Sequence, residues 1–185
     1  MFRAGLTATN WMGKSTTIQR FVDAHRELSC QTVSLSVILD QCPFPTVEKQ
    51  TIEASEWMTG KVREICTAAP GEIQLFDRTP VDILAFTLYA QDHTGADAQH
   101  IIEQILGLMD CFNTIFYIAI PETWPVGVTP SPEEIQFARL MDSYLCKAID
   151  QFALDVVAMP WDLDAREQML CQYAGATNFS DGDTS

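Results

Sequence analysis

Apolar segments and amphipathic segments alternate along this chain. Five short segments are almost continuously apolar, which is typical of strands buried on both faces of a parallel sheet. They cover residues 2–8 (FRAGLTA), 32–39 (TVSLSVIL), 72–77 (EIQLFD), 113–121 (NTIFYIAIP) and 154–160 (LDVVAMP). The segments between them carry apolar residues at helical spacing. This order predicts an α/β fold with a parallel five-stranded sheet and helices on both faces.

The expected helices alternate with these strands. Apolar residues recur at helical spacing in residues 14–28, from about 47, and in 81–91, 96–111, 131–152 and 164–173. The segment SPEE carries a capping box, in which Ser131 caps the helix and Glu134 reaches back. A chain of 185 residues is long enough for one domain with a substantial core. We predict a single domain over residues 1–174 and a flexible polar tail over 175–185.

Charge and composition narrow the classes of partner. The formal net charge is −14 and only eleven residues are Lys or Arg, so a nucleic-acid polymer would meet a repelling surface. The six cysteines form no CxxC pair, which favours reduced, buried thiols in a cytoplasm over a zinc site. We expect no export leader, because the first residues lack a basic segment followed by an apolar one, and no apolar run approaches the ~20 residues of a membrane helix. We therefore expect a cytoplasmic protein with neither polymeric nucleic acid nor membrane as a partner.

The stretch ATNWMGKST, residues 8–16, connects the first expected strand to the first expected helix. It ends as a phosphate-binding loop does, with a Lys for the outer phosphates and a Ser hydroxyl for magnesium. Ala8 replaces the usual first glycine, and Trp11 and Met12 are expected to point outward. The residues expected to bind ATP are Asn10, Trp11, Met12, Gly13, Lys14, Ser15 and Thr16, with Ser15 also a magnesium ligand.

Asp77 and Arg78 follow the third expected strand, in the segment QLFDRTPVDILAF. The carboxyl ends of parallel strands share one edge of a sheet, so Asp77 should face the magnesium of the loop. Arg78 would offer a cation for an acceptor's phosphate. A surface ion pair at a strand end is the alternative explanation of this dipeptide. If both residues are functional, they predict metal or base chemistry beside an acceptor site.

In their order along the chain, ATNWMGKST, FDRTPVDILAF and LDVVAMPWDLDARE resemble the P-loop nucleotide and nucleoside kinases. Thymidylate-kinase-like and deoxynucleoside-kinase-like enzymes, with related small bacterial and phage ATP-binding proteins, are the most similar members. The resemblance implies a P-loop NTPase three-layer sandwich with ATP and Mg²⁺ as cofactors. It implies that Lys14 and Ser15 hold ATP and magnesium and that Asp77 and Arg78 lie against the acceptor. The strand-end position of Asp77 makes it a further expected magnesium ligand. It also implies that residues 161–166, Arg166 among them, lie near the adenine.

The lid region departs from that family. Members usually supply arginines to the transferring phosphoryl group from the segment before the long helix, yet residues 122–138 contain none. Arg139 is close enough in sequence to substitute, and we expect it at the edge of the buried stripe of its helix. The expected catalytic residues are therefore Lys14, Asp77, Arg78 and Arg139.

The expected reaction is in-line transfer of the γ-phosphoryl group of ATP to a small acceptor. A nucleoside monophosphate, expected to be a deoxynucleotide, is favoured because Arg78 would otherwise lack a role. A deoxynucleoside is the alternative, and its hydroxyl would need a base, with Asp77 as the candidate and Asp40 as the reserve. The acceptor's base is expected near the helix over 47–66, where Trp57 could stack, although an aromatic residue at helical spacing is more often core.

The sequence leaves the roles of several residues, and the class of the protein, open. Gln50, Glu53 or Glu56 could hydrogen-bond the acceptor's base. Asp82 either stabilises a helix N-terminus, which is favoured, or contacts the acceptor. A regulatory P-loop protein that binds ATP or GTP is the rival class, supported by the arginine-free lid, whereas the charge disfavours a polynucleotide end kinase. The oligomeric state is open, with a homodimer as one option.

Overall fold

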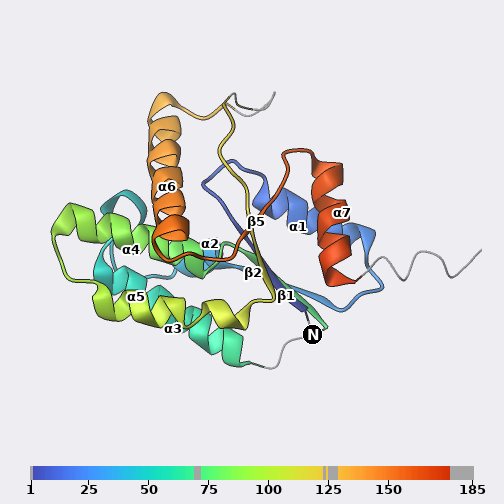
Figure 1. Ribbon diagram of the computed structural model, residues 1–185, viewed down its shortest axis with the longest axis horizontal. Coiled ribbons are helices and arrows are strands. Elements are labelled where there is room, and N and C mark those ends of the chain that lie inside the picture. The colour runs from blue at the N-terminus through green and yellow to red at the C-terminus, as the bar shows by residue number, and fades with distance from the viewer. Residues whose placement is uncertain (1, 69–71, 123, 125–128, 176–185) are drawn as a thin grey trace, which may run out of the picture.

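The computed structural model describes residues 2–68, 72–122, 124 and 129–175, which form a sheet between two layers of helices (Figure 1). All strand pairs are parallel, and the strand order is β2-β3-β1-β4-β5. The strands are β1 Phe2–Thr7, β2 Cys30–Ser34, β3 Ile73–Asp77, β4 Thr114–Tyr117 and β5 Val157–Ala158. The predicted α/β class with a parallel five-stranded sheet is confirmed. Residues 176–185 of the expected tail lie outside the described residues.

Helices α1 (Lys14–Ala24) and α7 (Leu163–Ala174) pack against each other on one face of the sheet (Figure 1). Their apolar side chains, with Phe21 and Leu170 fully buried, join alternate residues of the central strands in one core. This layer holds the start of α1, and therefore the expected phosphate-binding loop, against the carboxyl edge of β1.

The other face is covered by α3 (Ile52–Thr67), α4 (Pro80–Thr94), α5 (Gln99–Leu106) and α6 (Pro132–Gln151). Consecutive residues of β3 point to opposite faces of the sheet, and both faces carry apolar side chains. Leu75 belongs to the α1–α7 core, and its neighbour Phe76 belongs to the core on the opposite face. Both side chains are fully buried. The expected three-layer sandwich is confirmed, and the continuous apolar runs follow from burial on both faces.

The second apolar segment changes structure halfway, which corrects the expected strand over 32–39. β2 ends at Ser34, and Leu35–Leu39 form the short helix α2. The Ser34 hydroxyl accepts a hydrogen bond from the backbone N–H of Val37, so a helix cap ends the strand. Ser36, in the first turn of α2, consequently lies at the carboxyl edge of the sheet. Asp40 is the C-cap of α2.

Other elements also differ at their boundaries, and β5 covers only Val157–Ala158 of the strand expected over 154–160. The helix expected from about residue 47 consists of a 3₁₀ turn, Val47–Lys49, followed by α3. The helix expected over 96–111 is α5 followed by the 3₁₀ turn Met109–Cys111. The predicted capping box of Ser131 and Glu134 is confirmed at the start of α6. None of the described helices has the length and apolar character needed to cross a membrane.

The strand before the loop lies close to the residues that follow β3. A Cβ atom at Gly5 would overlap the side-chain methyl of Thr79 and would come within 3.2 Å of the Phe112 ring. The backbone N–H of Arg78 continues this approach with a 3.0 Å hydrogen bond to the Leu6 carbonyl. Glycine at position 5 therefore lets the Asp77–Arg78 segment sit directly beside the loop.

Candidate active site

The loop between β1 and α1 folds around an open cavity of about 470 Å³. Gly13, the N-cap of α1, has a left-handed backbone with φ of 74°, and Trp11 has φ of 69°. These turns aim the end of the loop and the N-terminus of α1 at the cavity, an arrangement that suits an anion. The lining of this loop cavity is Asn10, Trp11, Met12, Gly13, Lys14, Ser15, Thr16, Ser36, Asp77 and Arg78.

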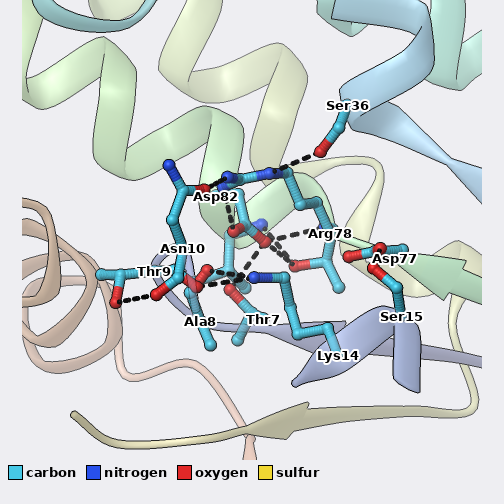
Figure 2. Close-up of polar contacts among 12 residues, drawn as sticks. Thr7, Ala8, Thr9, Asn10, Lys14, Ser15, Ser36, Asp77, Arg78 and Asp82 are labelled. Atoms are coloured by element: carbon cyan, nitrogen blue, oxygen red, sulfur yellow. Dashed lines mark hydrogen bonds and ion pairs between the residues drawn. The ribbon is translucent and has the colours of Figure 1, made fainter. Parts of the chain in front are cut away.

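Lys14 is buried at the base of the loop. Its Nζ donates hydrogen bonds to the carbonyl oxygens of Ala8 at 2.9 Å and Thr9 at 2.7 Å (Figure 2). Burial lowers the pKa of Lys14 to about 8, and the nearby Arg78 guanidinium acts in the same direction. The ammonium group therefore has hydrogen-bond acceptors but no salt bridge among the described residues, which leaves its charge available to an anion in the loop.

Ser15 and Asp77 meet at the same edge of the sheet. The Ser15 hydroxyl donates a hydrogen bond to Asp77 Oδ2, while Asp77 Oδ1 is buried and has no hydrogen-bond partner among the described residues (Figure 2). The described part of the chain contains no group of three or more His, Cys, Asp or Glu side chains placed to hold a metal. A hydroxyl and a carboxylate with one free oxygen are nonetheless the oxygen ligands that Mg²⁺ uses alongside phosphate and water.

Arg78 forms a bridge between three segments of the chain. Its Nε donates to Ser36 Oγ at 3.0 Å, its Nη1 pairs with Asp82 Oδ1 at 3.2 Å, and its Nη2 donates to Asn10 Oδ1 (Figure 2). The backbone of Arg78 is left-handed with φ of 76°, a conformation that costs free energy for a side chain of this kind. The guanidinium is thus fixed beside the loop by contacts to α2, α4 and the loop itself.

Asp82 is buried in the first turn of α4. Its Oδ2 accepts hydrogen bonds from the Thr7 hydroxyl at 2.7 Å and from the backbone N–H of Thr79 at 2.8 Å. The second bond is half of a capping box with Thr79. The favoured interpretation of Asp82 as a helix-stabilising charge agrees with these contacts, and Asp82 additionally holds Arg78 in place.

A second cavity of about 730 Å³ adjoins the loop cavity, and Asn10, Trp11 and Arg78 line both. We call it the acceptor cavity. Its walls come from the loop, α2, the 3₁₀ turn at Val47, α4 and α6. The lining residues are Ala8, Thr9, Asn10, Trp11, Leu39, Val47, Glu48, Arg78, Asp82, Ala85, Phe86, Glu134, Phe137, Ala138, Met141 and Leu145. A mostly apolar space with a few polar groups is typical of a small-molecule site.

A smaller hollow of about 360 Å³ extends the acceptor cavity towards α3. It shares Leu39, Arg78, Asp82 and Phe86 with that cavity, and Gln50 and Met58 line it as well. Gln50 is buried. Its Oε1 accepts a hydrogen bond from the backbone N–H of Val47, and its Nε2 donates one to the Ser55 hydroxyl oxygen. Of the residues expected near the acceptor's base, Gln50 is therefore at the cavity.

The remaining residues expected near the acceptor fall elsewhere. Trp57 packs against the core below α3 and lies under the Lys61 ammonium, and it lines none of these cavities. Glu53 and Glu56 are exposed on α3. Asp40 cannot serve as the reserve base at a strand end, because β2 stops six residues earlier.

The side chains of two residues expected to bind ATP, Met12 and Arg166, make contacts within the protein. Met12 is 1% exposed and packs in the α1–α7 core, which corrects the expectation that it points outward; Trp11, at 48% exposure, does point outward. Arg166 is 1% exposed and donates from Nη1 to the Met12 carbonyl at 2.8 Å and from Nε to the Pro160 carbonyl at 2.6 Å. It does not line the loop cavity, so it holds the loop from behind.

Arg139 is exposed on α6 and lines neither cavity. The expected stripe beside it is buried at Ala138, Met141 and Leu145. Part of the arginine-free lid, residues 123 and 125–128, lies outside the described residues. Sequence reasoning missed Ser36, Glu48 and Glu134 as cavity residues, because neither a motif nor a strand end marks them.

Comparisons with known proteins identify the fold. The sequence matches no protein-family model and no curated protein. Among solved structures, deoxyadenosine kinase from M. mycoides, with products dCMP and a flexible dCDP bound, aligns at 12% identity with a TM-score of 0.57. The match covers 95% of this chain and 100% of that one. Thymidylate kinase from Candida albicans aligns at 12% identity and a TM-score of 0.59, covering 96% of this chain and 92% of that one.

The NadR protein, in complex with NAD and AMP-PNP, aligns at 12% identity with a TM-score of 0.64. The match covers all of this chain and 51% of NadR, so this chain spans about half of that protein. At such low identity these likenesses show the fold alone. Together with the loop at the end of β1 and the Asp77–Arg78 segment at the end of β3, they show that this chain has the fold of the P-loop nucleoside and nucleotide kinases.

Proposed function

We propose that this protein is a kinase that transfers the γ-phosphoryl group of ATP to a small nucleoside or nucleotide acceptor. One observation carries the proposal: the cavity of the phosphate-binding loop and the acceptor cavity meet at Asn10, Trp11 and Arg78. A donor and an acceptor bound in the two spaces would have their reacting groups at that junction. Bringing two substrates together in this way supplies much of what phosphoryl transfer requires.

The residues at the junction support charge neutralisation during transfer. Lys14 would exchange its two carbonyl partners for phosphate oxygens, and the N-terminus of α1 would direct its N–H groups to the same phosphates. Arg78 is placed to meet the transferring group from the acceptor side. The acceptor oxygen would bond to the γ-phosphorus as the bond from that phosphorus to the bridging oxygen of ADP breaks.

Ser15 and Asp77 fit a magnesium ion. The test is the buried Asp77 Oδ1, which lacks a partner among the described residues although a buried carboxylate oxygen is normally satisfied. Ser15 Oγ and the Asp77 carboxylate would hold the ion, and bound magnesium would neutralise charge on the phosphates. Asp77→Asn is therefore expected to lower kcat.

The monophosphate acceptor predicted from the sequence depended on Arg78 having no other role. In the structure Arg78 has three partners, Ser36, Asp82 and Asn10, so its presence is explained without an acceptor phosphate. Arg78 therefore gives no reason to prefer a monophosphate acceptor over a nucleoside acceptor.

Coupled measurement of ADP release tests the proposal. Wild-type protein is assayed with ATP, Mg²⁺ and each of a panel of ribo- and deoxynucleosides and their monophosphates. We expect acceptor-dependent ADP release that falls by about a thousandfold or more in Lys14→Ala, because the outer phosphates lose their cation. Lys61→Ala, which removes a half-exposed lysine on α3 that lines neither cavity, is the control. Unchanged turnover in Lys14→Ala would refute the proposal.

A regulatory ATP-binding protein is the second candidate. It is favoured by the exposed position of Arg139 and by the lack of arginine in residues 122–138. If Arg139 closes over the phosphates, Arg139→Ala should reduce kcat and kcat/KM together by about a hundredfold, while ATP binding changes little. Slow ADP release that no acceptor accelerates, and that Arg139→Ala leaves unchanged, would support the regulatory protein.

A further inference from the structure

The acceptor cavity and its extension are lined by four charged residues, Arg78, Asp82, Glu48 and Glu134. Three of these carry carboxylates and one carries a cation, so the formal charge of the lining is −2. Among the described residues, no other Lys or Arg lines either space. Residues 123–128, which precede α6 in the sequence, contain no Lys or Arg.

The single cation is already compensated. Arg78 pairs with Asp82 in contact at 3.2 Å, and both side chains are largely buried, at 14% and 4% exposure. Each nitrogen of the guanidinium has a partner within the protein. A phosphate approaching Arg78 would also approach the carboxylate of Asp82, which is held by Thr7 and Thr79. In a partly buried site, that like-charge contact opposes binding.

The two helix N-termini beside the cavity are likewise occupied. Such termini commonly hold phosphate through free N–H groups. At α4 the Asp82 carboxylate accepts from the backbone N–H of Thr79, and at α6 the Glu134 carboxylate accepts from the backbone N–H of Ser131, each at 2.8 Å. Both carboxylates belong to residues that line the acceptor cavity. A phosphate there would have to displace an anion that the chain itself provides.

Cations outside the lining do not change this balance in the structure. Lys49 and Arg139 are the nearest in sequence to the lining residues Glu48 and Ala138, and neither of them lines the acceptor cavity or its extension. Lys14 lines the loop cavity on the donor side of the junction. The positive charge of the site is therefore concentrated where the triphosphate would bind, and the negative charge where the acceptor would bind.

We propose that the acceptor is a nucleoside without a phosphate group, uncharged or cationic, which reacts through a hydroxyl. The inference rests on the proposed kinase function and selects between its two acceptor classes. The hydroxyl oxygen bonds to the γ-phosphorus, the electrons of the broken bond leave with ADP, and the hydroxyl proton is released to water. The apolar walls formed by Val47, Phe86 and Phe137 suit the uncharged body of such a molecule.

The test compares each nucleoside with its own 5′-monophosphate, so that the base and the sugar are held constant. Binding is measured by calorimetry in the presence of Mg²⁺ and a non-hydrolysable ATP analogue, and turnover is measured with ATP. We expect the preferred nucleoside to bind and turn over with kcat/KM at least about a hundredfold above its monophosphate, because the phosphate meets net negative charge. A monophosphate that binds or reacts as well as its nucleoside would overturn the inference.

A charge-removal variant makes the test specific to the cavity. Glu48→Gln with Glu134→Gln removes two negative charges from the lining, and Gln at position 134 can still serve the helix cap. In this variant, the ratio of kcat/KM for the nucleoside to kcat/KM for its monophosphate should fall by about fivefold or more. Glu53→Gln with Glu133→Gln is the matched control, because both residues are exposed in the first turn of a helix and line neither cavity. Equal changes in both variants would overturn the inference.

The separate readouts distinguish this inference from the proposed function. Tight binding of a nucleoside without turnover would refute the kinase and support only the preference of the cavity for a nucleoside over its monophosphate. Turnover of monophosphates alone would support the kinase and refute the acceptor class. If neither compound binds, both are refuted.

Discussion

Several charges at the candidate site are buried without a full complement of partners. Lys14 contacts carbonyl oxygens in place of an anion, and Asp77 keeps one oxygen free among the described residues. Groups of this kind cost stability in the empty protein, since a buried charge loses its hydration. Both residues line one cavity, and there they would suit the proposed ligand, which carries both negative phosphates and a cation.

The buried ammonium of Lys14 predicts a particular pH dependence of stability. Its pKa is lowered from 10.5 to about 8, mainly by burial. Below pH 8 the charge is present in both folded and unfolded chains, so the folded chain bears the full cost of burying it. Between pH 8 and 10.5 only the unfolded chain keeps the proton, so this cost is relieved. The Lys14 contribution to the free energy of unfolding should therefore rise by roughly 3 kcal/mol over that range.

This contribution is measured by urea unfolding of the wild type and of Lys14→Met without nucleotide. The two proteins share all other titrating groups, so the contributions of those groups cancel in the difference. The free energy of unfolding of the wild type should increase relative to that of the variant between about pH 8 and pH 10.5. A constant difference would mean that Lys14 has its ordinary pKa in the folded protein.

The Arg78–Asp82 pair predicts separable effects on stability and on kinetics. Removing the guanidinium in Arg78→Ala leaves the buried Asp82 charge without its partner, which should cost about 3 kcal/mol of stability. In the folded fraction, the acceptor KM should rise more than the ATP KM, since the loop cavity keeps Lys14, whereas Arg78 is the only Lys or Arg that lines the acceptor cavity among the described residues. Substrate-saturation kinetics and denaturant unfolding of Arg78→Ala and Arg78→Lys check both effects. An unchanged acceptor KM would make the arginine purely structural.

At the residue scale, the sequence predicted which side chains meet at the loop but not what each contacts. Lys14, Ser15, Asp77 and Arg78 were predictable because a motif and a strand end mark them. The burial of Met12 was not, since the direction of a loop side chain depends on a core built from α7, more than a hundred residues away. Glu48 and Glu134 carry no local signal for a cavity, because only the packing of α2, α4 and α6 creates it.

At the scale of elements, helix α7 supports the loop on the side away from the cavity. Arg166 reaches from α7 to the carbonyls of Met12 and Pro160 and to the Thr17 hydroxyl, and burial lowers its pKa. These contacts connect α7, late in the sequence, to the loop that follows β1. If ATP binds in the loop as proposed, these contacts would make Arg166 a positioning residue for it.

Shortening this side chain should therefore loosen the loop. Arg166→Met is expected to raise the ATP KM by about tenfold or more and to lower stability by about 2 kcal/mol, because loop carbonyls lose their donors. Arg166→Lys, which keeps the charge and one donor, should recover part of both losses. Saturation kinetics with ATP and the acceptor separate the readouts, and the acceptor KM should change little. A normal ATP KM in Arg166→Met would contradict the assignment.

Element boundaries were less predictable than element order. The run TVSLSVIL is apolar for most of its length, and an apolar run this short does not by itself distinguish a strand from a buried helix. The structure divides it at Ser34, where a side-chain cap starts α2. That division brings Ser36 to Arg78, so a contact of the site depends on a boundary that periodicity did not reveal.

At the scale of the whole molecule, the site joins segments from almost the full length of the chain. The loop follows β1, Arg78 follows β3, and α6 and α7 contribute from the second half of the sequence. Helices of both layers therefore contribute to the lining of the two cavities. A ligand in these cavities would stabilise elements that belong to all three layers at once.

This arrangement predicts that nucleotide binding raises the thermal stability of the entire chain. A ligand that binds only the folded protein adds about 2.7 kcal/mol when present at roughly a hundred times its Kd. For a chain of this size, such a gain corresponds to an increase in Tm of about 5–10 °C. Wild type with Mg²⁺ and a non-hydrolysable ATP analogue should show it in a single calorimetric transition. Lys14→Ala should lose the increase and Lys61→Ala should keep it, because Lys14 lines the loop cavity and Lys61 does not. An equal increase in all three proteins would place the nucleotide outside the loop.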